Sequence, residues 1–200
     1  GSPAASADEA PTGPPGVAVS PTEGSHEVAL LAGGCFWCLE SAFDPVPGVI
    51  SAVSGYAGGP EQHPTYKQVS AHKTGHAEVV RVVYDPKVLS YEQVLHIFWR
   101  NIDPFDGRGQ FCDKGSQYRP AVFPMSPAQK TQAEADIAAL SSKLGKPFAV
   151  TIEDNGVFWE AEGYHQNFWR TNEDHYQRYR RGCRRDDRLQ EVWGAEAGGH

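Results

Sequence analysis

The sequence has no apolar run approaching the roughly 18 residues that a membrane-spanning helix needs. Its 200 residues include only four cysteines, too few for a scaffold built from disulfides. Basic side chains are the minority, and the formal net charge is −7. We therefore expect neither nucleic acid nor a membrane surface as a partner. The few cysteines instead indicate thiol chemistry or metal binding.

Residues 1–25 are rich in Ala, Pro, Ser and Gly, so we predict a disordered leader. The opening Gly-Ser resembles a cloning remnant. Because the sequence does not begin with Met, we expect that a natural segment, such as a signal peptide, has been removed. Both a cytoplasmic and an exported location are consistent with this expectation. Residues 26–200 are then expected to form one domain, which is long enough for a substantial core.

Hydrophobic periodicity and turn residues predict an α+β fold, a mixed sheet with helices packed on it. From about residue 156 the chain is aromatic and polar, which predicts a coil-rich C-terminal part with one or two short helices. Serine caps open the second and third predicted helices, and a glycine ends the third. Strands are predicted over 26–33, 48–59, 76–86, 118–124 and 147–154, and helices over 35–45, 90–102 and 126–145.

The stretch "GGCFWC" places Cys35 in the first turn of the first predicted helix. Free N–H groups and the helix dipole stabilise a thiolate there, and the preceding glycines permit a sharp turn. Phe36 and Trp37 could then form an apolar pocket for a small group, such as a methyl on sulfur. Alternatively, Cys35 and Cys38 are buried hydrophobic residues and the two rings belong to the core.

The C-x-x-C spacing of Cys35 and Cys38 also fits two other kinds of site. A thioredoxin-like protein would use such a pair to exchange disulfides. A zinc site would need further ligands, and no second C-x-x-C pair completes one. We therefore expect no metal.

Several motifs, in this order, resemble the methionine sulfoxide reductase A family, the peptide-methionine (S)-S-oxide reductases: "GGCFWCLESAF", "GVISAVSGYAGG", "PTYKQVSAHKTGHAEVVRVVYDP" and "GSQYRPAVF". The match runs from about residue 27 to 170. It implies a ferredoxin-like core and a catalytic domain that reduces the S-epimer of methionine sulfoxide, free or in proteins. Cys35 would be the nucleophile, and Phe36 and Trp37 would hold the methyl group. The resemblance further implies no cofactor, a thioredoxin-like reductant and a monomer.

Sulfoxide reduction requires attack on sulfur while the oxygen gains a proton. Burial would raise the pKa of Glu78 and let it carry that proton, and tyrosine hydroxyls could hold the oxygen without adding charge. The resemblance implies that Glu78, Tyr66 and Tyr118 bind the oxygen and that Asp113 is the acidic residue of the family. From the pattern alone, Glu78 is a solvent-facing strand residue, the tyrosines are packing residues, and Asp113 organises a turn.

Histidines receive no catalytic role. The stretch "EGYHQNFW" is similar to the "YHQ" segment of the family, and we interpret His165 within it as a loop organiser rather than a ligand or base. His72 likewise has no assigned role.

After the attack and the loss of methionine, Cys35 would hold the oxygen as a sulfenic acid. A second thiol would then condense with it to give a disulfide, which an external dithiol reduces. Family members commonly use a C-terminal cysteine, which favours Cys183. Arginines surround Cys183 in "RYRRGCRRDDR" and would lower its pKa, unless they form a solvated face. The chain departs from the family in having Cys38 where many members have glycine, and in having one C-terminal cysteine where many have two. Cys38 and Cys112 therefore remain alternatives.

Two other functions fit the sequence. A general disulfide oxidoreductase would use Cys35 and Cys38 and would not need Glu78. A non-catalytic module could capture oxidised methionine through the Phe-Trp pocket. Only a reductase releases more methionine than the amount of protein present.

Overall fold

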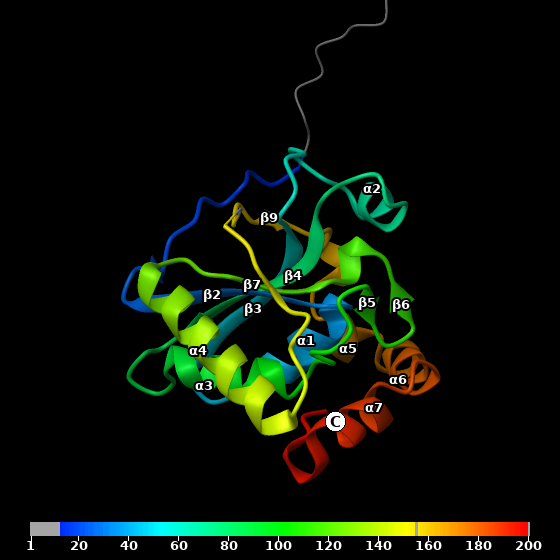
Figure 1. Ribbon diagram of the computed structural model, residues 1–200. Coiled ribbons are helices and arrows are strands. Elements are labelled where there is room, and N and C mark those ends of the chain that lie inside the picture. Colours follow the sequence, from blue (N-terminus) through cyan, green and yellow to red (C-terminus); the bar gives the residue numbers. More distant parts are fainter. Residues whose placement is uncertain (1–12, 155, 200) are drawn as a thin grey trace, which may run out of the picture.

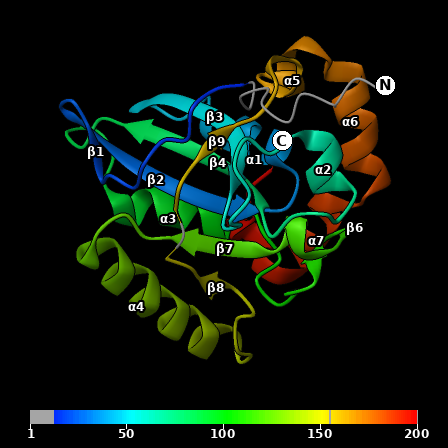
Figure 2. The same ribbon diagram turned by 90° about the horizontal axis from the view of Figure 1, so that it is seen from above.

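The structure, a computed structural model, describes residues 13–154 and 156–199 (Figures 1 and 2). Within these residues a mixed sheet has the strand order β8-β7-β2-β4-β3-β9, and β1 pairs with β2 outside this path. Neighbouring strands are antiparallel except β7 and β8, which are parallel. The strands are β1 (Thr22–Glu23), β2 (His26–Gly33), β3 (Val49–Ala57), β4 (Ala77–Tyr84), β7 (Pro120–Phe123), β8 (Thr151–Ile152) and β9 (Trp159–Glu160).

The central strands and two helices confirm the predicted ferredoxin-like core. The chain order is β2-α1-β3-β4-α3-β7, whereas the spatial order of the strands is β7-β2-β4-β3. Each helical connection therefore passes over one intervening antiparallel strand. Helices α1 (Phe36–Phe43) and α3 (Tyr91–Trp99) lie against the same face of this sheet (Figure 1).

Local signals set the helix boundaries as predicted. The Ser90 side chain accepts a backbone hydrogen bond at the start of α3, in a capping box. The Ser126 side chain accepts a backbone hydrogen bond at the start of α4 (Pro127–Leu144), and that helix ends at Gly145 in the left-handed region with φ 72°. The strand predicted over 147–154 is only the two residues of β8.

The core has two layers, one on each face of the sheet. Successive side chains of a strand point to opposite faces, so β2 contributes to both layers. Ala29 and Leu31 pack with α1 and α3, whereas Val28 and Leu30 pack with residues outside the helices, including Phe158. The central strands are therefore buried on both faces.

The N-terminal part is more ordered than predicted. A disordered leader was expected over 1–25, but Val17 forms a β-bridge with Phe158, and β1 pairs with β2. These pairings extend the domain by several residues toward the N-terminus. Residues 1–12 lie outside the described residues. No helix in the described part of the chain is long and apolar enough to cross a membrane.

The C-terminal part is more helical than the predicted coil. Helix α6 (Glu173–Gly182) buries Tyr176 and Arg180, and helix α7 (Arg185–Trp193) buries Arg185 together with Leu189 and Trp193. Charged residues therefore interrupt the buried faces, which makes them hard to recognise from hydropathy. Both helices lie beside the hairpin β5–β6 (Figures 1 and 2). The helices are α5 (Phe168–Thr171), α6 (Glu173–Gly182) and α7 (Arg185–Trp193). The other short elements are α2 (Tyr66–Ser70), β5 (Gly109–Gln110), β6 (Asp113–Lys114) and the 3₁₀ turns Ser116–Tyr118, Gly163–His165 and Gly194–Glu196.

Candidate active site

The predicted site residues, except Cys183, line one cavity of about 190 Å³. It lies at the start of α1, where α2, β4, the loop 109–118 and α6 meet. Helix α6 adds two residues that the sequence analysis did not single out, His175 and Tyr179. The lining residues are Cys35, Phe36, Trp37, Tyr66, Glu78, Asp113, Tyr118, His175 and Tyr179.

Cys35 is the N-cap residue of α1 and is 6% exposed. The turn before Cys35 depends on Gly34, whose φ of +83° is unfavourable for other residues. A Cβ at this position would also collide with the side chain of Gln110. The expectation that the helix start lowers the pKa of Cys35 is wrong for the free protein. Burial raises that pKa well above its ordinary value, together with the hydrogen bond to Cys38 and the nearby carboxyl groups.

Cys38 lies in the first turn of α1, 1% exposed and hydrogen-bonded to Cys35. Burial opposes its ionisation, but the bond from Cys35 and the guanidinium groups of Arg185 and Arg180 lower the pKa of Cys38 to about 6. These contacts favour ionisation of Cys38 over ionisation of Cys35.

The two arginines are buried, at 1% exposure for Arg180 and 2% for Arg185. Arg180 pairs with Asp186 and donates to the Tyr176 hydroxyl, and Arg185 donates to the carbonyl of Gly33. Sequence proximity had suggested that the arginines act on Cys183. The fold instead brings these two close enough to Cys38 to lower its pKa.

Glu78 lies on β4 and is 2% exposed, because this strand is buried on both faces. The pattern-based alternative of a solvent-facing residue is therefore wrong. Glu78 accepts a hydrogen bond from the Phe36 backbone N–H at 3.1 Å. Burial raises the pKa of Glu78 well above its ordinary value despite that bond, and the charges of Asp113 and Cys38 raise it further. These effects favour the protonated carboxyl, which can give up a proton.

Tyr66 and Tyr118 keep their hydroxyl protons. Burial raises the pKa of Tyr66 to about 12, and burial with the nearby Glu78 carboxyl also raises the pKa of Tyr118. Glu162 fixes the start of α2 by accepting the Tyr66 backbone N–H at 3.0 Å and the Tyr56 hydroxyl at 2.9 Å. Both site tyrosines can therefore donate hydrogen bonds to an oxygen in the cavity.

A disulfide joins Cys112 to Cys183 beside the cavity, across 71 residues of sequence. Cys35 and Cys38 are free, so the expected Cys35–Cys183 pair is not the one in this structure. Next to the disulfide, the Tyr179 hydroxyl donates a hydrogen bond to Asp113. Burial nevertheless raises the pKa of Asp113. The disulfide and this bond together connect α6 to the hairpin that carries Asp113.

Among the described residues, one group of side chains has a spacing that suits a metal. The sulfur atoms of Cys112 and Cys183 and the carboxylate of Asp113 lie within 4.8 Å of one another. The disulfide occupies both sulfur atoms, so they cannot act as thiolate ligands in this state.

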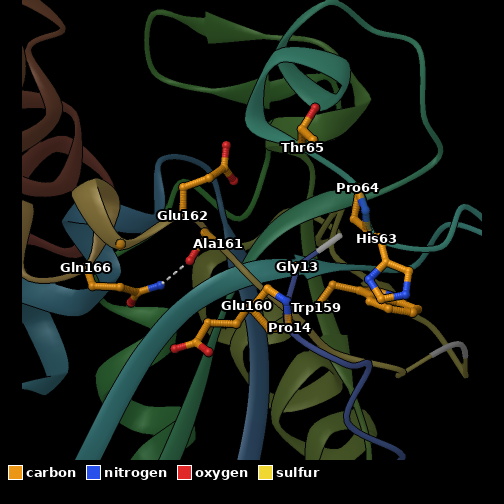
Figure 3. A pocket seen from close by; sticks show the side chains of 11 residues that line it. Gly13, Pro14, His63, Pro64, Thr65, Trp159, Glu160, Ala161, Glu162 and Gln166 are labelled. Atoms are coloured by element: carbon orange, nitrogen blue, oxygen red, sulfur yellow. Dashed lines mark hydrogen bonds between the residues drawn. The ribbon is translucent and has the colours of Figure 1, made fainter. Parts of the chain in front are cut away.

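A second cavity, of about 320 Å³, is lined by none of the predicted site residues (Figure 3). One link to the active site is Glu162, whose carboxylate accepts a hydrogen bond from the Tyr66 backbone N–H. The lining contains no thiol, so it cannot supply the nucleophile. The lining residues are Gly13, Pro14, His63, Pro64, Thr65, Trp159, Glu160, Ala161, Glu162, Gly163 and Gln166.

The family model for peptide methionine sulfoxide reductase matches residues 27–197. The chain belongs to the peptide methionine sulfoxide reductase family. It is 46% identical over 172 residues to peptide methionine sulfoxide reductase MsrA of Bacillus subtilis, over 85% of this chain and 97% of that protein. It is 45% identical over 185 residues to peptide methionine sulfoxide reductase MsrA/MsrB of Vibrio cholerae, covering 91% of this chain. The match covers 49% of that Vibrio protein, about half its length.

The solved structures agree with this membership. The crystal structure of Mxr1 from Saccharomyces cerevisiae in reduced form has a TM-score of 0.70 and 32% identity. That match covers 76% of this chain and 88% of the yeast chain. The motifs that gave the resemblance to the reductase family thus lie on the fold of a reductase.

Proposed function

We propose that this protein reduces the S-epimer of methionine sulfoxide, free or in proteins, with Cys35 as the nucleophile. One observation carries this proposal: the cavity combines a thiol, a carboxyl group that favours its protonated form, two tyrosine hydroxyls and two aromatic rings. Reduction of a sulfoxide uses the thiol to attack the sulfur while the carboxyl group protonates the oxygen and the hydroxyls hold it. The two rings can hold the methyl group.

In the first step the sulfoxide oxygen lies between Glu78 and the hydroxyls of Tyr66 and Tyr118. The Cys38 thiolate takes the proton of Cys35 through their hydrogen bond. The Cys35 thiolate attacks the sulfoxide sulfur while Glu78 protonates the oxygen. The hydroxyl group then moves from the substrate sulfur to the Cys35 sulfur while the bond between the two sulfur atoms breaks, so that methionine leaves and Cys35 becomes a sulfenic acid.

Phe36 and Trp37 would hold the methyl group of the substrate. Both lie in the cavity wall directly after Cys35, at the start of α1. A chiral site that fixes the methyl group on these rings and the oxygen near Glu78 accepts one epimer at sulfur. These two contacts together would select one epimer, and the family resemblance implies that it is the S-epimer.

We further propose that Cys38, rather than Cys183, resolves the sulfenic acid. Two facts support this choice: Cys38 is already hydrogen-bonded to Cys35, and Cys183 is bonded to Cys112. Cys38 then gives up the proton that it took from Cys35, and its thiolate attacks the Cys35 sulfur. The hydroxyl group of the sulfenic acid takes up this proton and leaves as water, and a Cys35–Cys38 disulfide forms. A thioredoxin-like dithiol would reduce this disulfide, as the family resemblance implies.

The site draws on residues from Cys35 to Tyr179, which supports one catalytic domain. We expect that domain to act as a monomer, and light scattering would test its mass. The reaction needs no cofactor, because the thiols supply both electrons.

The direct test of the proposed activity uses separated epimers of methionine sulfoxide with dithiothreitol as reductant. We expect many turnovers with the S-epimer and little reaction with the R-epimer. Methionine is measured by chromatography against the amount of protein. Equal rates for both epimers would contradict the proposed contacts. Release that never exceeds the protein present would favour the binding module.

The choice of resolving cysteine predicts different outcomes for two serine variants. Both Cys38→Ser and Cys183→Ser should release about one equivalent of methionine, because reduction precedes disulfide formation. With thioredoxin as reductant, Cys38→Ser should then stop, and Cys183→Ser should continue. Cys112→Ser is the matched control, since it breaks the same disulfide as Cys183→Ser.

Mass mapping after one turnover tests the pairing directly. We expect Cys35 linked to Cys38 in the wild-type protein. A linkage of Cys35 to Cys183 or Cys112, with Cys38 free, would show that our choice is wrong.

A further inference from the structure

His165 contacts three aromatic residues of the active-site cavity without lining it. It ends the 3₁₀ turn Gly163–His165 and is 1% exposed. Its Nδ1 accepts a hydrogen bond from Trp37 Nε1 at 3.1 Å. The centroid of its ring lies 5.0 Å from that of Phe36 and 4.3 Å from that of Tyr66. One imidazole thus supports both rings of the proposed methyl pocket and one proposed oxygen donor.

The residues that follow His165 fix the position of its loop. The Gln166 side chain donates to the carbonyls of Ser54 at 2.8 Å and Ala161 at 3.0 Å, the latter bond drawn in Figure 3. The Asn167 backbone N–H donates to the carboxylate of Glu40 at 2.8 Å. Ser54 belongs to β3 and Glu40 to α1, the helix that carries Trp37. The imidazole is therefore anchored to the same frame as the ring it contacts.

The Trp37 indole has contacts of two kinds. Its face stacks on Phe168 with ring centroids 3.9 Å apart and an interplanar angle of 13°. Stacking alone lets a ring slide and rotate in its own plane, whereas a hydrogen bond fixes one atom of its edge. The bond to His165 therefore defines which part of the indole faces the cavity.

Packing alone does not explain an imidazole at position 165. Burial lowers the pKa of His165 to about 4, so the ring is neutral at neutral pH and Nδ1 can accept a hydrogen bond. The proton is then on Nε2, which is buried and has no hydrogen-bond partner among the described residues. A buried unpaired donor is unfavourable, and phenylalanine would fill similar space without one. What phenylalanine lacks is the acceptor for Trp37.

We propose that His165 is a positioning residue, which sets the indole of Trp37 against the methyl group of the sulfoxide. This inference rests on the proposed function, because it assumes that Trp37 contacts the substrate. His165 takes no part in proton transfer. It acts through Trp37, and its imidazole also packs against Phe36 and Tyr66.

Two substitutions separate the hydrogen bond from the packing. His165→Phe keeps a ring but removes the acceptor, and His165→Asn removes the ring but keeps an acceptor oxygen near the place of Nδ1. We expect His165→Phe to lower kcat/KM about 10- to 100-fold, through misplacement of the reacting group, with KM for the S-epimer raised. His165→Asn should retain most of the wild-type kcat/KM. Thermal unfolding of each variant identifies losses that come from instability, and His96→Asn, on the exposed side of α3, is the matched control.

A double-mutant cycle with Trp37→Phe tests whether His165 acts through Trp37. Trp37→Phe removes the N–H donor, so it should lose activity by itself, and adding His165→Phe should then change kcat/KM little. Multiplicative effects of the two substitutions would overturn the inference. It would also be overturned by a well-folded His165→Phe with wild-type kcat/KM, or by a well-folded His165→Asn as impaired as His165→Phe. Failure of the proposed function is distinguishable, because the wild-type protein itself would then not turn over the S-epimer.

Discussion

Cys35→Ser should abolish reduction of the S-epimer and leave the fold intact. A serine hydroxyl ionises far less readily than a thiol and cannot become a sulfenic acid, so neither attack nor oxygen transfer can proceed. The fold should survive because Cys35 is the N-cap residue of α1, a position that serine favours. Methionine formed in a single turnover, without any reductant, is the measurement.

The matched control is Cys38→Ser, which changes the other buried thiol of the same helix turn. It should still release about one equivalent of methionine in a single turnover, but more slowly, because the group that takes the proton of Cys35 is lost. Cys35→Ser should release none. Thermal unfolding of both variants shows whether the helix start remains intact. Substantial methionine release by Cys35→Ser would place the nucleophile at another residue.

The sequence predicted the site well where its motifs lie on regular elements of the core. Cys35 follows β2, and Glu78 lies on β4, the strand that pairs with β2. Neighbouring strands bring residues that are distant in sequence to one place, so the family motifs meet in one cavity. The roles of the individual residues stay predictions until the variants are measured.

The pKa of the two active-site thiols could not be read from the sequence. The helix start favours a thiolate, but its effect on Cys35 competes with burial and with nearby carboxyl groups, which only the fold reveals. The arginines that determine the outcome lie about 145 residues away in the sequence, on helices α6 and α7. The sequence predicted only one or two short helices there, because Arg180 and Arg185 are charged residues on buried faces.

The pairing of cysteines likewise depends on the tertiary fold. Cys112 and Cys183 are 71 residues apart, and their Cα atoms lie 5.0 Å apart in the structure. Sequence spacing alone does not determine which of the four cysteines form a disulfide. The pairing of Cys35 with Cys183 was expected because members of the family commonly use a C-terminal cysteine. The docking of α6 against the hairpin β5–β6 decides the pairing instead.

Glu78→Gln should slow the chemical step far more than it weakens binding. The glutamine side chain can still hydrogen-bond the sulfoxide oxygen and the Phe36 backbone, but it cannot release a proton at neutral pH. General-acid assistance is typically worth about 10²- to 10⁴-fold in rate, so we expect the single-turnover rate to fall by a factor in that range. The affinity for the S-epimer should change much less. It is measured with and without Glu78→Gln in the Cys35→Ser background, which prevents the reaction.

The pH dependence distinguishes proton transfer from a purely structural role of Glu78. Burial raises the pKa of Glu78, so the active protonated form is present at low pH and is lost as pH rises through that pKa. The wild-type single-turnover rate should therefore fall as the pH rises. Ionisation of Cys35 also changes with pH, so it is followed separately by thiol alkylation. Glu78→Gln should remove this fall along with most of the rate, because its amide does not titrate. A variant with the wild-type rate, or one that keeps the same alkaline fall, would exclude Glu78 as the proton donor and leave Tyr66, Tyr118 and Asp113 as candidates.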